Sequence, residues 1–215
     1  MKYKPNWVSM VSLLLLIAIQ SVHYGYILGT WNRINHIMVA KYGWTKDQLV
    51  FYEAFIGNTP VMGMIIGRFI GSPLVNKGRF LCIIISSVAM ILGDCAMLFL
   101  NIYSFLAGRL ICGIGAGLFF ASAPRYIEEC SPPHLFSLLY TLFALGIALN
   151  RPIVMFAATM IPEKVSHPTF EYVDFLKLDK TWRYFIGLPI VFCIIFIAGM
   201  FLLVKCDTPM YLISQ

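Results

Sequence analysis

The chain has 215 residues, of which 60% are hydrophobic and 12% are charged, and its mean hydropathy is +0.80. Soluble domains carry about a quarter charged residues, so this composition excludes an ordinary soluble domain and indicates an integral, multi-pass membrane protein. The net charge of +6 comes from lysines and arginines spread singly over the polar connections. The sequence therefore lacks the basic patch of a nucleic-acid-binding protein.

Apolar runs of about 20 residues, the length that crosses the hydrocarbon of a bilayer, occur six times. They predict an all-α fold in which residues 1–215 form a single six-helix transmembrane bundle. Lysines precede the first run but no small-residue cleavage site follows it, so we expect this run to be retained as a helix. The predicted spans are 7–29, 51–74, 81–100, 105–124, 138–160 and 184–204.

Glycines recur at helical spacing in the second and fourth spans. The stretch "CGIGAG" (112–117) has the composition of a phosphate loop, but such a loop needs a preceding strand and a free helix N-terminus. The run around it is unbroken and apolar, and a backbone in hydrocarbon must satisfy its own hydrogen bonds, so we predict a helix. Small residues four apart let two helices approach closely. The predicted helix-packing residues are Gly63, Gly67 and Gly71 in the second span and Gly113 and Gly117 in the fourth.

The third and the fourth span each carry one charged side chain at the depth of the hydrocarbon. Asp94 lies six residues before the end of its span and Arg109 lies four residues after the start of its own. At about 1.5 Å per residue they reach a similar depth. Because charges inside a membrane pair with one another, we predict an intramembrane Asp94–Arg109 ion pair.

The fifth span carries Asn150 and Arg151 toward its middle, directly before Pro152. Proline leaves a backbone carbonyl without its helical partner at this point. One interpretation is a substrate-binding site for an anion in a central cavity. The favoured interpretation is a contact of Arg151 with a neighbouring subunit or with lipid headgroups, since nothing else in the chain completes a solute site.

Catalytic and metal-binding patterns are missing from the sequence. The six cysteines include no C-x-x-C pair and the four histidines are scattered, so a metal site and a disulfide framework both fit poorly. There is no H-E-x-x-H motif, no G-x-S-x-G motif and no pair of aspartates in facing spans. We expect no enzyme activity, no metal and no cofactor.

The longest polar connection, 161–183, is too short to bury a core of its own. Its apolar residues interleave with charges, which is typical of a segment that lies along the membrane surface. The alternative is that this segment packs against a partner protein.

Short motifs lie at the ends of the predicted helices. They are "GYILG" (25–29), "SPLVNKGRF" (72–80), "GRLICGIGAG" (108–117), "PRYIEECSPP" (124–133), "WRYFIGLPIVF" (182–192) and "CDTPMYLI" (206–213). In order and spacing these motifs resemble the N-terminal half of the sugar porters of the major facilitator superfamily.

The resemblance implies a transporter of two six-helix halves, with substrate bound between them near the midplane and alternating access by rocking of one half on the other. This chain then corresponds to one half, and its partner would be a second half or another copy of itself. The first-helix acid of proton-coupled members falls on Ile27, and the fifth-helix glutamine that contacts sugar falls on Ala144.

The resemblance also implies a conformational network of arginines and carboxylates at the cytoplasmic helix ends. Here Arg79, Glu129 and Asp207 remain, whereas Phe136 and Ser137 stand where the family has an arginine and a glycine. A buried carboxylate without a donor costs stability. We therefore expect Glu129 to pair with Arg79 or with helix-terminal N–H groups, and Asp207 to be solvated.

Two functional hypotheses follow. The first is a half-size carbohydrate or small-solute transporter that works only with a second half. The second is a non-transporting accessory subunit of a larger membrane complex, for example in an energy-transducing membrane, derived from a sugar transporter. The family resemblance favours the plasma membrane, and the mitochondrial inner membrane is the alternative.

Overall fold

The computed structural model describes residues 7–130, 136–165 and 169–204, and in these ranges the regular structure is helical. The all-α prediction is therefore confirmed. The elements are α1 (Trp7–Tyr42), α2 (Lys46–Val75), α3 (Arg79–Met97), α4 (Ile102–Cys130), α5 (Phe136–Ala148), α6 (Asn150–Ala158), α7 (Phe170–Leu178), α8 (Thr181–Gly199) and a π-helical turn, Met200–Val204.

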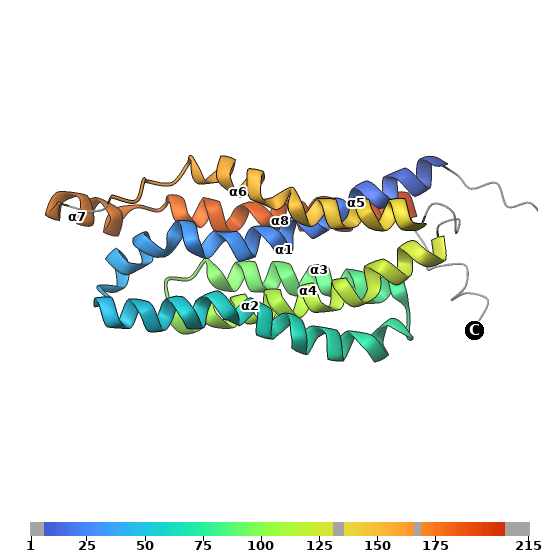
Figure 1. Cartoon of the computed structure of the whole chain (residues 1–215), viewed down its shortest axis with the longest axis horizontal. Coiled ribbons are helices and arrows are strands. Elements are labelled where there is room, and N and C mark those ends of the chain that lie inside the picture. The colour runs from blue at the N-terminus through green and yellow to red at the C-terminus, as the bar shows by residue number, and fades with distance from the viewer. Residues whose placement is uncertain (1–6, 131–135, 166–168, 205–215) are drawn as a thin grey trace, which may run out of the picture.

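The helices form an elongated bundle of two layers (Figure 1). In one layer α4 packs along both α2 and α3, and in the other α1 packs along α5, α6 and α8. The layers meet mainly where α1 touches α4 and where α3 touches α8. The short helix α7 lies at one end of the bundle, beside the end of α1.

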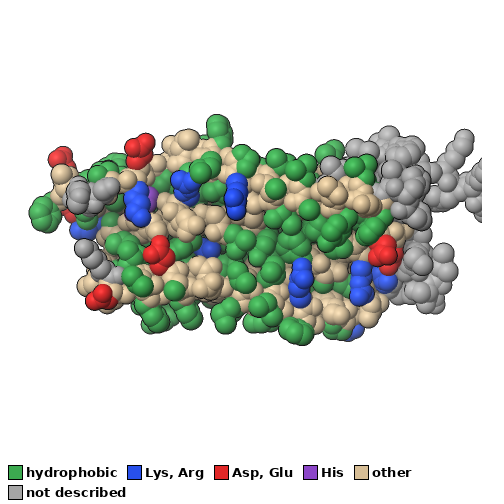
Figure 2. All heavy atoms as spheres, viewed as in Figure 1, with side chains coloured by type: hydrophobic (Ala, Val, Ile, Leu, Met, Phe, Trp, Pro, Cys, Tyr) green, Lys and Arg blue, Asp and Glu red, His purple; other side chains and the backbone are tan. Residues whose placement is uncertain are grey.

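Five helical stretches of the described residues are long and apolar enough to cross a membrane, by length and composition. They coincide with the five later spans expected from sequence, and the first expected span, 7–29, falls inside α1. On the face shown in Figure 2, hydrophobic side chains cover the middle and acidic side chains lie toward the two ends. This distribution suits a bundle whose middle is surrounded by lipid. The five stretches are Asp47–Val75, Arg79–Met97, Ile102–Cys130, Phe136–Ala158 and Thr181–Leu202.

The glycine stripes of α2 and α4 face each other. A Cβ built on Gly67 would overlap the backbone carbonyl oxygen of Ile114, and a Cβ built on Gly63 would lie 3.0 Å from the Cα of Gly113. A Cβ on Gly117 would come within 2.8 Å of the Cα of Gly67. The two backbones therefore touch where a side chain would separate them, which is the arrangement that small residues permit.

Three details differ from the predicted boundaries. The helix α1 continues to Tyr42, well beyond the expected end of the first span. The fifth span is interrupted at Leu149, between α5 and α6, three residues before Pro152. The connection 161–183 contains a helix, α7, which Thr169 caps by accepting the backbone N–H of Tyr172 at 3.4 Å.

The turn between α1 and α2 is fixed by a capping box. The Thr45 hydroxyl accepts the Gln48 backbone N–H at 3.4 Å, and the Gln48 side chain accepts the Thr45 N–H at 3.1 Å. The sequence T-K-D-Q carries the spacing of this motif. Trp44, in the same turn, stacks between Tyr42 and Tyr52, with ring centroids 5.1 and 4.4 Å away.

Candidate functional site

A cluster of buried polar side chains lies between the two layers. It contains His23 from α1, Asp94 from α3 and Arg109 from α4, each with at most 1% of its surface exposed. Along α3, Asp94 stands between Met90 and Met97, which belong to two separate hydrophobic clusters. The polar cluster therefore occupies the junction of two apolar cores, inside the predicted spans.

Asp94 pairs with His23 and not with Arg109. His23 Nε2 lies 2.7 Å from Asp94 Oδ2, while Arg109 Nη2 donates to the backbone carbonyl of Ile27 at 3.0 Å. The expected Asp94–Arg109 ion pair is thus not the arrangement of the described residues. Asp94 and Arg109 line one cavity, but the carboxylate of Asp94 points toward α1.

Other polar groups extend the cluster toward α8. Cys112 Sγ donates to Asp94 Oδ1 at 3.4 Å, and Gln20 Nε2 donates to Met90 Sδ at 3.0 Å and to Cys193 Sγ at 3.6 Å. Sulfur atoms are weak partners. These contacts hold the side chains in place, and none of them adds another charged group to the cluster.

An enclosed cavity of about 10 Å³ lies beside the cluster, lined by Asp94, Arg109 and Thr30 together with Ile27, Met97, Ile186 and Pro189. Arg109 Nε and Nη1 are buried and have no hydrogen-bond partner in the described part of the chain. A cavity of this size has room for about one water molecule when it is lined by polar groups. The carboxylate and the guanidinium thus share an internal space.

The two candidate substrate residues of the fifth span behave differently. Asn150 is half-buried, its amide donates to the carbonyl of Ile147, and a Cβ on Gly25 of α1 would overlap its side chain. Arg151 is exposed at the start of α6. Asn150 is therefore engaged in packing α6 on α1, and a role for either residue toward a solute remains a hypothesis.

The charges at the opposite bundle end include the expected contact of Arg79 with Glu129. Arg79 Nη2 lies 2.9 Å from Glu129 Oε1 and both side chains are mostly buried, at 17% and 13% exposure. Arg125 Nη1 donates to Asn76 Oδ1 at 3.4 Å beside them. Asp207 lies outside the described residues. The contact joins the start of α3 to the end of α4.

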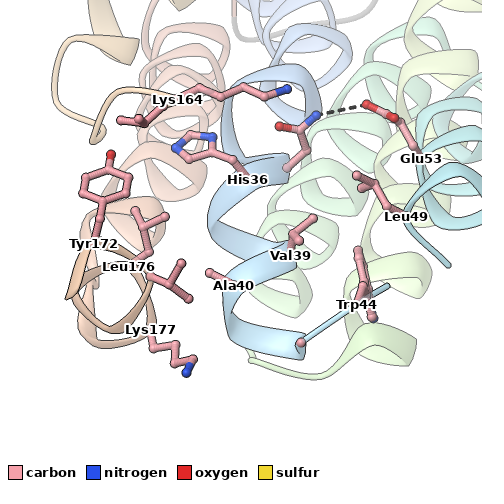
Figure 3. Close-up of a pocket in the computed structure, with 14 residues that line it drawn as sticks. His36, Val39, Ala40, Trp44, Leu49, Glu53, Lys164, Tyr172, Leu176 and Lys177 are labelled. Atoms are coloured by element: carbon pink, nitrogen blue, oxygen red, sulfur yellow. Dashed lines mark hydrogen bonds between the residues drawn. The ribbon is translucent and has the colours of Figure 1, made fainter. Parts of the chain in front are cut away.

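A groove of about 480 Å³ opens at the end of the bundle that carries α7 (Figure 3). Val39 and Ala40 of α1 form its floor. Tyr172, Leu176 and Lys177 of α7 stand on one side, and Trp44, Leu49 and Glu53 stand on the other, as Figure 3 shows. All the residues that line the groove, except Glu53, lie in connections between the predicted spans.

The groove is lined by donors, on Lys164, Lys177 and Tyr172, and by acceptors on Asn35, His36 and Glu53. Asn35 Nδ2 donates to Glu53 Oε1 at 3.0 Å, which leaves the buried Asn35 Oδ1 without a partner among the described residues. His36 lies beyond the first predicted span; its Nε2 lies 3.0 Å from the carbonyl oxygen of Pro162. Burial lowers the pKa of His36, so its ring is neutral near pH 7 and Nδ1 is an acceptor. Asn35 Oδ1 and His36 Nδ1 are therefore buried acceptors without a partner among the described residues.

The thiols and histidines of the described residues do not gather into a metal site. Within the ranges given above, no three His, Cys, Asp or Glu side chains lie close enough to hold a metal ion. Cys82, Cys112 and Cys193 are free and buried.

Comparison with known proteins decides the family. The sequence model described as "Sugar (and other) transporter" matches residues 13–215 of the chain. The chain belongs to this sugar transporter family. The match spans every described helix from the first turns of α1 onward, so it covers the whole bundle and not one motif.

Curated members of the sugar transporter family resemble the chain at low identity. Hexose transporter 1 of Plasmodium knowlesi is 26% identical over 207 residues, which are 89% of this chain and 39% of that protein. Hexose transporter 1 of Toxoplasma gondii is 22% identical over 219 residues, 94% of this chain and 38% of that protein. The chain thus spans about two fifths of the length of these relatives.

Solved structures of sugar transporters share the fold. The proton:xylose symporter XylE bound to 6-bromo-6-deoxy-D-glucose superposes with a TM-score of 0.79 and 20% identity, over 97% of this chain and 47% of that one. XylE from E. coli in its inward open conformation gives a TM-score of 0.74 over 95% of this chain. The described bundle therefore has the fold of about half of a major facilitator transporter.

His23 is a partner of Asp94 that the sequence did not lead us to predict. A signal was present, because His23 lies six residues before the end of the first predicted span and Asp94 lies six before the end of the third. Spans one and three cross the membrane in the same direction, so equal distances from their ends give equal depths. The residues of the groove were not predicted, because the groove forms only when α7 folds back on α1.

Proposed function

We propose that this chain supplies one half of a carbohydrate transporter and moves solute only in combination with a second half, either another copy of itself or a different chain. The family match over residues 13–215 is the observation that carries this proposal. The superposition on about half of XylE supports it, since transporters of this fold bind substrate between two halves.

The substrate class in this proposal is a monosaccharide. Relatives named as hexose transporters and a structure named as a xylose symporter support this class. Ala144 is exposed on α5 at the position where the family resemblance implies a sugar-binding glutamine, and alanine offers no hydrogen bond to a hydroxyl group. The solute must therefore be held by other side chains, including those of the second half.

A second candidate function is that of a non-transporting accessory subunit in a larger membrane complex. Ile27 and Ala144 favour it, because both replace polar residues that the family resemblance assigns to transport. Ile27 is buried, and its contribution to the polar cluster is a backbone carbonyl. The tight glycine contacts between α2 and α4 suit either function, since both require the bundle to fold.

The mass of the native particle separates the two candidates. The particle is extracted in mild detergent from its own membrane, without overexpression, and its protein mass is compared with the 24.3 kDa of the chain. About twice that mass supports two halves around a shared path. A particle many times larger, from which the chain cannot be released, supports the accessory subunit.

Transport itself is tested by reconstituting the same particle into liposomes and measuring exchange of labelled glucose and xylose. The proposal expects saturable exchange that unlabelled hexose competes for. Liposomes prepared from the same membrane after depletion of the particle are the control. Equal exchange in both preparations would contradict the transport proposal.

A further inference from the structure

The buried cluster contains one carboxylate between two basic side chains. Asp94 is the acid, and His23 and Arg109 are the bases, all of them sealed from solvent. An isolated charge in a bilayer interior is costly, and ionisable residues found there pair with one another or carry protons and ions. One acid is too few to balance two bases when both are charged.

We propose that His23, Asp94 and Arg109 form a buried site for one proton, in which Asp94 pairs with His23 when the site is protonated and with Arg109 when it is not. The structure has the first of these two contacts, with His23 Nε2 2.7 Å from Asp94 Oδ2. When the proton leaves to solvent water, His23 becomes neutral and the carboxylate keeps its negative charge.

The charge count explains why the partner changes. In the protonated state the His23–Asp94 pair is neutral overall, and the positive charge of Arg109 faces the carbonyl dipole of Ile27 and the ring of Phe105, whose centroid lies 5.9 Å from the guanidinium carbon. In the deprotonated state Asp94 and Arg109 balance each other and the cluster has no net charge. Attraction between opposite charges is strong at low dielectric, so the free carboxylate turns toward the guanidinium.

The geometry permits this exchange. Asp94 and Arg109 line the same enclosed cavity, and Arg109 Nε and Nη1 are buried without a partner in the described residues. The residues before them, Gly93 and Gly108, bring the backbones of α3 and α4 together: a Cβ on Gly93 would lie 2.7 Å from the carbonyl oxygen of Gly108. The cavity leaves room for a side-chain rotation or for one bridging water molecule.

Other titratable groups that face the cluster do not compete for the proton near neutral pH. They are Cys112 from α4, Cys193 from α8 and Tyr26 from α1, whose hydroxyl donates to the carbonyl of Phe185 at 3.0 Å. Thiols and phenols ordinarily ionise above pH 7. The proton exchange therefore involves His23 and not these groups.

The exchange links protonation to the packing of the two layers. In the protonated state Asp94 joins α3 of one layer to α1 of the other, whereas the Asp94–Arg109 pair stays within the layer of α3 and α4. The proton thus controls one of the polar contacts between the layers. This inference concerns the chain itself and does not depend on its carrying a solute.

The test is a nuclear magnetic resonance titration of the chain in lipid nanodiscs, with the four histidines labelled with ¹⁵N. The ring nitrogen shifts report the protonation of each histidine between about pH 5 and pH 11, a window that extends above the range in which unperturbed histidines titrate. His23→Gln assigns the His23 signal and His36→Gln assigns that of His36. We expect His23 to bind its proton more tightly than His36, because only His23 has a carboxylate partner.

Arg109 provides the decisive variants. Removing its positive charge in Arg109→Gln favours the protonated state, so the midpoint of the His23 titration rises by about one pH unit or more. Arg109→Lys keeps the charge and leaves the midpoint close to that of the unaltered chain. A midpoint that is the same in Arg109→Gln as in the unaltered chain, or a His23 signal that does not titrate, overturns the proposal.

Infrared spectroscopy of the unaltered chain supplies a test that does not depend on folded variants. The carboxylate bands of Asp94 are expected to change with the same midpoint as the His23 signal, since its hydrogen-bond partner changes. Carboxylate bands that follow a different midpoint in the unaltered chain contradict a shared site.

Discussion

The guanidinium of Arg79, at the start of α3, lies 2.9 Å from the carboxylate of Glu129, near the end of α4. Its Nε also donates to the same oxygen, at 3.1 Å. Both side chains are mostly buried, so the pair is screened less by solvent than a surface pair. The resemblance to the sugar porters implies that such pairs join helix ends while the transporter is closed on one side.

Exchange of the two charges tests this contact. Arg79→Glu and Glu129→Arg alone each place like charges in contact, and we expect each to cost about 1 kcal/mol or more and to lower the thermal midpoint by about 2–4 °C. The double variant restores the attraction and recovers most of the loss. Thermal unfolding in detergent measures all three. If the double variant is as unstable as the sum of the single ones, the pair contributes nothing to stability.

Gly67 and Gly57 form a matched pair of sites in α2. A Cβ on Gly67 would overlap the carbonyl oxygen of Ile114, whereas a Cβ on Gly57 meets no atom within 4 Å. We expect Gly67→Ala to destabilise the bundle by about 1–3 kcal/mol through overpacking. Gly57→Ala is expected to be neutral or stabilising by up to about 1 kcal/mol, since alanine is the better helix former.

The buried thiols give a direct readout of this difference. Cys82, Cys112 and Cys193 are sealed from solvent in the folded bundle and react with a thiol-specific fluorophore once it unfolds. Heating the two variants in the presence of the fluorophore gives their unfolding midpoints. Equal midpoints for Gly67→Ala and Gly57→Ala would show that α2 and α4 separate without cost.

Features that depend on the order of residues within one helix could be predicted from the sequence. The spans follow from apolar length, and the facing stripes of α2 and α4 follow from glycines four apart. The partner of Asp94 depends on how α3 is rotated about its axis. The position of Asp94 along its span does not determine that rotation. The break at Leu149 lies three residues before Pro152. The proline therefore indicated the helical turn that contains the break, but not the residue at which the helix is interrupted.

Substitutions at Arg151 and Gly25 distinguish a solute-binding role of α6 from a packing role. Arg151 is exposed, so we expect Arg151→Ala to change the unfolding free energy by no more than about 0.5 kcal/mol. A Cβ on Gly25 would overlap the Asn150 side chain, and Gly25→Ala is expected to destabilise by about 1–3 kcal/mol. The thiol assay measures both. Loss of anion transport in a stable Arg151→Ala particle would instead support the anion site.

The helix α7 carries exposed apolar side chains beside exposed charges at the end of the bundle. Phe170, Phe175 and Leu178 are 94%, 53% and 80% exposed, while Leu176 is buried against the bundle. Amphipathic helices of this kind lie in the membrane interface with their apolar side chains among the lipids. We therefore expect α7 to rest on the membrane surface, with Leu178 in contact with lipid and Asp174 in contact with water.

Spin labels at these two positions distinguish the membrane surface from a partner protein. In lipid nanodiscs, a label on Leu178→Cys is expected to be relaxed mainly by oxygen, which concentrates in lipid, and a label on Asp174→Cys mainly by a water-soluble nickel complex. Because Asp174 is exposed and, among the described residues, pairs with Lys177 alone, the label there is expected to leave the fold unchanged and serves as the control. Equal access of the nickel complex to both labels would show that α7 stands clear of the lipid, and protection of Leu178 only in the native particle would favour a protein partner on this face.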